Sequence, residues 1–97
     1  MTKSELSGSW YVYIVKCNDN SLYTGITTDI ERRIAEHNDS TQNKGAKYTR
    51  SRQPVKLVFL EESGSRSEAT KRELTIKKLN KKQKQLLISN HSVCNKN

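Results

Sequence analysis

The stretch Val12–Ile26, VYIVKCNDNSLYTGI, places two apolar runs on either side of a polar segment. Both runs are rich in β-branched and aromatic residues, which favour strands. The segment between them, NDNS (18–21), consists of side chains that close on their own backbone and tolerate left-handed conformations. We therefore predict a β-hairpin with strands over residues 10–17 and 22–27.

Two tyrosines, Tyr13 and Tyr23, lie in opposite strands of this hairpin. They either form a cross-strand packing pair or direct two hydroxyls toward a ligand. Gly25 marks a place where the backbone bends or another group approaches closely. The rest of the chain has to decide between these alternatives.

A short helix follows the hairpin. Thr28 and Glu31 fit a capping box, with Thr28 as the cap. The helix runs to about His37, and Asn38 can end it in a left-handed turn. Residues 39–53 then form a polar loop, and loops of this length in compact domains are usually functional or disordered.

The second half of the chain predicts one strand and two helices. Residues 55–60, VKLVFL, are apolar on both faces, which predicts a central strand covered on both sides. A second capping box, Ser65 to Glu68, opens a helix to about Leu79, and another helix spans about 81–88. The order β-β-α-β-α-α indicates an α/β fold: a small three-stranded antiparallel or mixed sheet flanked by helices.

A single domain is expected over residues 10–88, between a disordered segment 1–9 and a flexible tail 89–97. Two cysteines, Cys17 and Cys94, match neither a disulfide framework nor a zinc site, which favours a reducing cytoplasm. No stretch of the sequence approaches the roughly 20 apolar residues of a membrane span.

The net charge of +8 is concentrated in the last third of the chain. Residues 71–97 contain eight Lys or Arg and a single acid, Glu73, whereas ten basic residues nearly balance nine acids before them. This asymmetry favours a polyanionic partner, although lysine-rich helices are also simply soluble.

Two charged residues fall on the apolar sides of their helices. Arg33 lies about 60° from Ile30 at the edge of the core, where it either packs its stem or presents a fork to a phosphate. Glu73 shares a stripe with Ala69 and Ile76. A pair with Lys77, four residues on, suits an exposed surface, so a metal ion or a buried arginine better explains this placement.

These residues together resemble the GIY-YIG nuclease domain over roughly residues 10–79. The likeness rests on YVY (11–13), YTG (23–25), an arginine ten residues after the second tyrosine, and a glutamate on a later helix. The segments YTGIT (23–27) and GAKYTR (45–50) are most similar to the small stand-alone bacterial members. The resemblance implies a metal-dependent DNA endonuclease that is structure-selective and linked to DNA repair or recombination.

The resemblance also implies roles for individual residues. One of the hydroxyls of Tyr13 and Tyr23 would activate the nucleophile, Arg33 would steady charge on the scissile phosphate, and His37 could carry a proton. Glu73 would hold one Mg²⁺ or Mn²⁺ ion. The asparagine that ends the family's site has no clear match; Gln85 by spacing and Asn80 by residue type are the candidates.

DNA, including branched or flapped forms, is the expected partner; RNA is not excluded, and no membrane partner is expected. Basic residues and one tyrosine would follow the phosphate backbone without reading its sequence. This set comprises Lys44, Lys47, Tyr48, Arg50, Arg52, Lys77, Lys78, Lys81 and Lys82. Two alternatives remain open: a non-catalytic nucleic-acid-binding module of the same fold, and a protein that binds an acidic protein partner.

Overall fold

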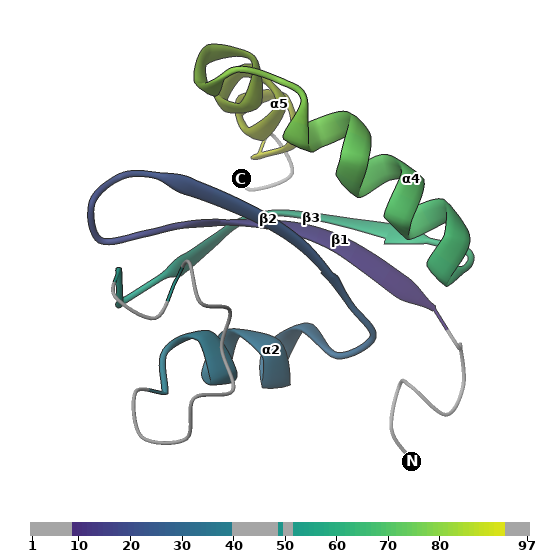
Figure 1. The fold of residues 1–97 in the computed structure, drawn as a ribbon, viewed down its shortest axis with the longest axis horizontal. Helices are drawn as coiled ribbons and strands as arrows, with labels where there is room; N and C mark the ends of the chain where they lie inside the picture. The colour runs from purple at the N-terminus through teal and green to yellow at the C-terminus, as the bar shows by residue number, and fades with distance from the viewer. Residues whose placement is uncertain (1–8, 40–48, 50–51, 93–97) are drawn as a thin grey trace.

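The elements follow each other in the predicted order, β-β-α-β-α-α (Figure 1). The computed structural model describes residues 9–39, 49 and 52–92. Its helices and strands are β1 (Trp10–Lys16), β2 (Leu22–Thr27), α2 (Ile30–His37), β3 (Lys56–Ser63), α4 (Arg66–Lys77) and α5 (Lys81–Ser92). Among these described residues, no helix is long and apolar enough to cross a membrane.

The sheet has the order β2-β1-β3, and both strand pairs are antiparallel. The prediction that residues 55–60 form the central strand is wrong, because β1 lies in the middle and β3 at an edge. A β-bulge explains the misleading pattern: the register shifts between Ile14 and Val15, so that Ile14 faces Phe59 while Val15 faces Leu57. The bulge interrupts the alternation of β3, whose apolar residues pack on both sides of the sheet.

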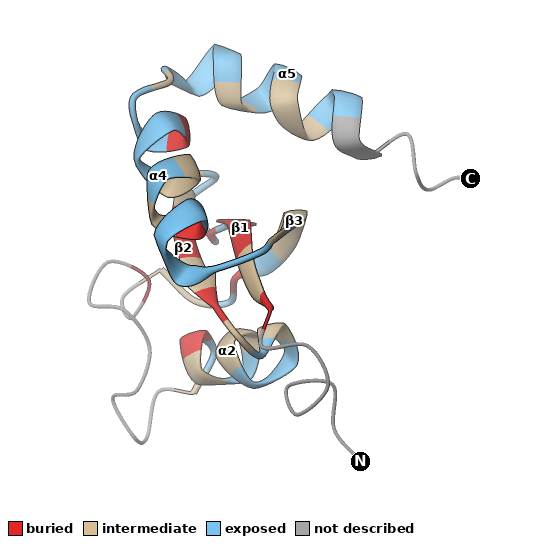
Figure 2. Cartoon of the chain, turned by 90° about the vertical axis from the view of Figure 1, so that its right-hand side faces the viewer, coloured by how far each residue is buried: buried red, intermediate tan, exposed pale blue. Residues whose placement is uncertain are grey.

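Each face of the sheet is covered by helices, with α2 on one side and α4 and α5 on the other (Figure 1). The side chains of β1 alternate between the two resulting cores. Val12 and Ile14 pack toward α4 and α5, with Phe59, Ala69 and Ile76. The buried residues of the opposite core are Tyr13, Val15, Cys17 and Val55. Figure 2 shows the buried residues concentrated on the strands between the helical layers.

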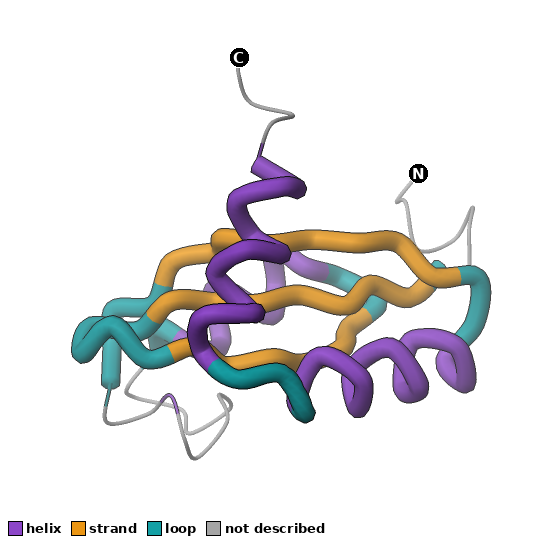
Figure 3. Tube along the Cα trace, turned by 90° about the horizontal axis from the view of Figure 1, so that it is seen from above, coloured by secondary structure: helices purple, strands orange, loops and turns teal. Residues whose placement is uncertain are grey.

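The two C-terminal helices take different paths over the same face. Figure 3 shows α4 running along the sheet beside β2, and α5 crossing back over the strands. The path of α4 brings it close to β2, which contains Tyr23. Helix α5 extends to Ser92, four residues past the predicted end, and Asn80 caps it through a reciprocal pair of hydrogen bonds with Gln83 (2.8 and 3.0 Å).

The predicted turn and caps are correct in type but differ in detail. Asn20 adopts φ 69° in the hairpin turn, where Asp19 accepts the backbone N–H of Ser21. Asp29, not Thr28, caps α2, since its carboxylate accepts the Arg32 N–H (3.1 Å). Asn38 ends α2 in a right-handed conformation, φ −97°, so the predicted left-handed turn is wrong.

The ends of the predicted domain also shift slightly. Ser65 caps α4 as predicted, and Glu68 reaches back to the N–H of Gly64. Ser9, placed by prediction in a disordered segment, is buried and donates a hydrogen bond to Glu62 of β3 (2.7 Å). Ser9 is therefore part of the described fold.

Thr24→Val is expected to stabilise the protein by about 1 kcal/mol, because it removes an unmet polar group. Thr24 in β2 is 2 % exposed, and its hydroxyl has no hydrogen-bond partner among the described residues. Thr27 is a matched control, since its buried hydroxyl accepts the N–H of Asp29 (3.1 Å). Urea denaturation should show Thr24→Val raising and Thr27→Val lowering the midpoint; equal effects would contradict the prediction.

Candidate active site

Tyr13 lies at the centre of the face covered by α2. Its side chain is 1 % exposed, and its residue is paired with Gly25 across the β1–β2 register. A Cβ atom on Gly25 would lie 2.5 Å from the Tyr13 hydroxyl oxygen and 2.7 Å from Cζ. The tyrosine ring therefore occupies the space that any larger residue at position 25 would fill.

Tyr23 and His37 complete an aromatic cluster around Tyr13. The two tyrosine rings are 6.5 Å apart and tilted by 46°, and His37 meets each edge-on at 5.7 and 5.5 Å. Such edge-to-face contacts are favourable for aromatic rings. The two tyrosines therefore form a packing pair across the strands, and only Tyr23, which is partly buried, also reaches the surface; the Tyr13 hydroxyl is buried and bonded to His37.

A chain of hydrogen bonds runs through the buried part of this cluster. The Tyr13 hydroxyl lies 2.8 Å from His37 Nε2, and Nδ1 of the same ring lies 2.7 Å from Thr49 Oγ1. Arg33 Nε donates to the Tyr13 oxygen at 3.4 Å, so the tyrosine proton can be donated to His37. This assignment makes Nε2 the acceptor and Nδ1–H the donor to Thr49.

Thr49 is a site residue that the sequence analysis missed. It is fully buried and holds His37 from outside α2, although it lies twelve residues further along the chain. Other bonds tie the same end of α2 to the segment before β3. Gln53 donates to the His37 carbonyl (2.6 Å), and the Asn38 side chain both accepts from and donates to Val55 (2.7 and 3.2 Å). The histidine is consequently fixed from two sides.

The environment of the cluster keeps its groups neutral near pH 7. Burial raises the pKa of Tyr13 to about 12, against the lowering effect of the Arg33 guanidinium, while Tyr23 and Glu73 raise it further. Burial and the nearby Arg33 charge lower the pKa of His37 to about 4. Neutral His37 accepts the hydrogen bond of Tyr13, and because the pKa of Tyr13 lies far above that of His37 the proton stays on the tyrosine, so the pair fixes the orientation of the hydroxyl.

Arg33 lies at the edge of the core, as predicted, whereas Arg32 is directed to solvent. Its guanidinium binds Glu36 through Nη1 (2.8 Å) and Tyr13 through Nε. Burial lowers the pKa of Arg33, but the bonds to Glu36 and Tyr13 outweigh it and raise the pKa overall. A charged fork is therefore held beside the tyrosine hydroxyl.

Glu73 lies on α4, on the opposite face of the sheet from α2, and is only 16 % exposed at its side chain. It forms an ion pair with Lys77 (3.1 Å), the pairing that the sequence analysis regarded as less suitable. The Lys77 ammonium is 5.9 Å from the centre of the Tyr23 ring, within the range of a cation–π contact. Lys77 therefore lies beside Tyr23 while it pairs with the partly buried Glu73 carboxylate. The periodicity of the helix could not predict this arrangement, because Tyr23 belongs to a strand.

The donor set suits one hard divalent cation with few protein ligands. Glu73 offers a single carboxylate beside the tyrosine cluster, and Mg²⁺ commonly retains water and takes phosphate oxygens in addition to one carboxylate. Within the described ranges, no group of three His, Cys, Asp or Glu residues could hold a metal by itself. The residues present therefore fit a cation completed by water and a phosphate-bearing ligand.

The predicted nucleic-acid contacts are only partly within the described structure. Lys44, Lys47, Tyr48 and Arg50 lie outside the described residues. Arg52 binds Asp19 of the hairpin turn (3.0 Å), and Lys77 belongs to the candidate active site. Lys78, Lys81 and Lys82 are exposed around the junction of α4 and α5. Of the two candidates for the family asparagine, Asn80 caps α5 and Gln85 lines a separate groove.

Comparisons with known proteins agree with this fold. Residues 9–86 match the model of the GIY-YIG catalytic domain. A UPF0213 protein of Desulfotalea psychrophila is 59 % identical over 80 residues, which cover 82 % of this chain and 71 % of that protein.

Two solved structures are similar as well. The solution NMR structure of protein EF2693 of E. faecalis has 46 % identity, a TM-score of 0.56 and 86 % coverage of both chains. That of the UPF0213 protein BH0048 of Bacillus halodurans has 46 % identity, a TM-score of 0.53 and coverage of 84 % and 83 %.

The structure combines a three-stranded antiparallel sheet, tyrosines from both hairpin strands and an arginine beside one of them. The chain belongs to the GIY-YIG family, a nuclease superfamily, and its similar relatives are UPF0213 proteins.

Lowering the pH from 7.5 to 5 is expected to cost about 2 kcal/mol of stability through His37. The pKa of His37 is about 4 in the folded state and about 6.5 when unfolded, so only the unfolded chain gains a proton between these values. The contribution of neutral His37 to the free energy of unfolding is fully present above pH 6.5 and is lost as the pH falls toward 4. Urea denaturation at both pH values should show a smaller loss for His37→Gln than for wild type. His91→Gln, at the only other histidine, should retain the full loss.

Proposed function

We propose that this protein is a metal-dependent DNA endonuclease that hydrolyses phosphodiester bonds, selects its substrate by shape and acts in DNA repair or recombination. The observation that carries the proposal is the hydrogen-bonded series Arg33–Tyr13–His37–Thr49, with Tyr23 and Glu73 beside it. Its membership of a nuclease superfamily and the basic last third of the chain support the same reaction class.

Each residue has a role that follows from its position. Tyr23 is the tyrosine at the surface, so its hydroxyl meets the attacking water or the phosphate. Tyr13 and His37 hold the site in place: neutral His37 accepts from the Tyr13 hydroxyl, whose oxygen accepts from Arg33 Nε and so fixes the guanidinium beside Tyr23. Arg33 would donate to a non-bridging phosphate oxygen, since its guanidinium is held beside the Tyr13 hydroxyl at the edge of the core.

Glu73 is the residue that would hold a Mg²⁺ or Mn²⁺ ion. When bound, such an ion stabilises the charge that develops on the leaving oxygen. Lys77 would release the Glu73 carboxylate and turn to a phosphate, because both partners of the ion pair then gain a stronger ligand of opposite charge. Because this ion pair would open only when substrate binds, Glu73 would become available to the metal only in the complex with nucleic acid.

A non-catalytic nucleic-acid-binding module is the second candidate. Two observations favour it: Tyr13 is almost fully buried, and Lys77 neutralises Glu73 in the free protein. This candidate predicts salt-sensitive binding to nucleic acid without turnover.

Cleavage of end-labelled DNA separates the two candidates. Linear, nicked, flapped and branched DNA of one sequence are incubated with the protein in Mg²⁺, Mn²⁺ or EDTA, and RNA of the same sequence is included. Metal-dependent products, most abundant for one shape, are expected. Binding to these substrates without products in either metal would overturn the nuclease proposal and leave the binding module.

A further inference from the structure

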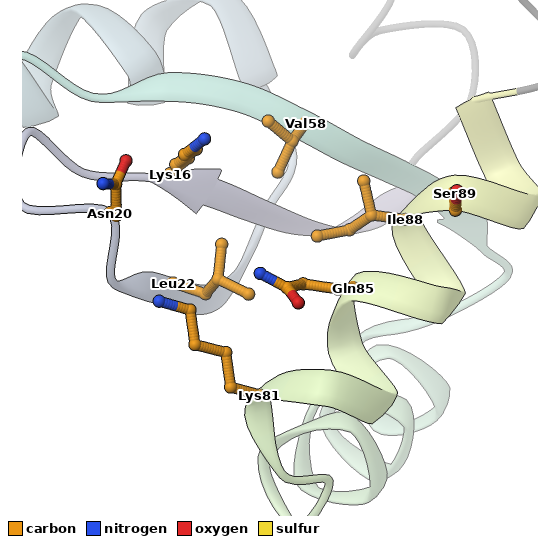
Figure 4. Close-up of a pocket in the computed structure, with 8 residues that line it drawn as sticks. All are labelled: Lys16, Asn20, Leu22, Val58, Lys81, Gln85, Ile88 and Ser89. Atoms are coloured by element: carbon orange, nitrogen blue, oxygen red, sulfur yellow. The ribbon is translucent and has the colours of Figure 1, made fainter.

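A groove lies on the other face of the sheet, between α5 and the ends of the β1–β2 hairpin (Figure 4). Its volume is about 500 Å³, within the range of about 300–1,000 Å³ that is usual for small-ligand sites. Tyr13, His37 and Arg33 do not line it, so it is distinct from the candidate active site. Its lining consists of Lys16, Asn20, Leu22, Val58, Lys81, Gln85, Ile88 and Ser89.

The rim of the groove is cationic and contains no acid. Lys16 lies directly opposite Lys56 in the β1–β3 register, so the two side chains share a face of the sheet. Like charges in this position repel each other, and within the described part of the chain neither lysine has an ion-pair partner. Lys81 of α5 adds a third positive charge from across the groove. Bound anionic groups would relieve this repulsion.

The floor and the walls of the groove have a different chemistry from the rim. Leu22 and Ile88 offer apolar surface from β2 and α5, and Val58 offers more beside the bulge of β3. The amide groups of Asn20 and Gln85 lie beside this surface (Figure 4). Amides both donate and accept hydrogen bonds, as the edge of a nucleobase requires.

We propose that this groove binds one unpaired nucleotide of a nucleic-acid strand, with its base on the apolar floor and its flanking phosphates on Lys16 and Lys81. The aliphatic surface can contact the face of a base, the amide groups can bond to its edge, and the lysines can bind the phosphates beside it. A paired base inside a duplex cannot enter such a groove, because its faces are stacked and its edge is occupied.

This inference deepens the proposed function, since it names the feature that would make the protein selective for shape. A flap or a branch provides unpaired nucleotides next to a duplex, and the groove would retain one of them while the duplex meets the tyrosine face. It rests on the proposed function only for the identity of the strand, because binding to the groove can be measured without cleavage.

The test is a binding titration in EDTA, which prevents metal-dependent cleavage. The probes are a fluorescent oligothymidylate, a blunt duplex, thymidine monophosphate and inorganic phosphate. The double variant Lys16→Ala/Lys81→Ala should bind the oligothymidylate at least tenfold more weakly than wild type at about 50 mM salt. It should also reduce the slope of log K against log salt by about 1.4. Lys71→Ala, at an exposed lysine of α4 outside the groove, is the matched control and should change affinity less than threefold.

A second variant tests the base rather than the charge. Gln85→Trp places a large side chain in the groove but retains every lysine. It should therefore lower the affinity for the oligothymidylate and leave the affinity for the blunt duplex unchanged. NMR spectra should show amide shifts of Leu22 and Gln85 with the oligothymidylate and thymidine monophosphate. Shifts of equal size with inorganic phosphate alone would overturn the proposal in favour of a simple anion site.

The outcomes also separate this proposal from the nuclease proposal. If the double lysine variant binds the oligothymidylate like the control, the groove is not the nucleotide site, whatever the cleavage assay gives. If the groove binds as expected but wild type does not cleave any substrate in Mg²⁺ or Mn²⁺, the nucleotide site stands and the nuclease proposal fails.

Discussion

Glu73→Gln is expected to lower the rate of DNA cleavage by roughly 10³-fold, while DNA binding in EDTA changes little or becomes tighter. The Glu73 carboxylate lies beside the tyrosine cluster and suits a divalent cation, and a metal ion contributes several kcal/mol to stabilising a phosphoryl-transfer transition state. Glutamine has the same shape but no charge. It also frees Lys77, which favours binding to phosphates.

Glu68→Gln is the matched control on the same helix. Glu68 is exposed, and its carboxylate accepts only the N–H of Gly64, which a glutamine oxygen also accepts. Cleavage by this variant should remain within about threefold of wild type. Single-turnover rates and EDTA binding should be measured for both variants. If Glu73→Gln cleaves at the wild-type rate, the assignment of the metal to Glu73 is wrong.

The hairpin and the tyrosine pair could be predicted because their signals are local. Alternation of side chains in β1 and the turn chemistry of NDNS (18–21) determine which residues face α2, and both are visible in the sequence. The same holds for Arg33 at the edge of the core and for Ala69 and Ile76 beneath α4, which follow from helical periodicity.

The contacts that fix His37 could not be predicted, because they depend on how a loop returns to the helix. Thr49 is an ordinary threonine in a polar segment, and only the fold brings it to 2.7 Å from the His37 ring. The position of β3 was mispredicted for a related reason. Helices cover both faces of the sheet, and the bulge places Val58 and Phe59 in the same core, so an edge strand has the apolar pattern of a central one.

Gly25→Ala is expected to destabilise the protein by about 3 kcal/mol and to lower cleavage with it. The added Cβ would lie 2.5 Å from the Tyr13 hydroxyl, and this ring cannot yield freely because it is buried and bonded to His37 and Arg33. Gly64→Ala is the control, since its Cβ meets only the end of the flexible Glu68 side chain at 3.1 Å. Urea denaturation should show a large loss for position 25 and less than about 1 kcal/mol for position 64. Equal losses would mean that Tyr13 does not require the space above Gly25.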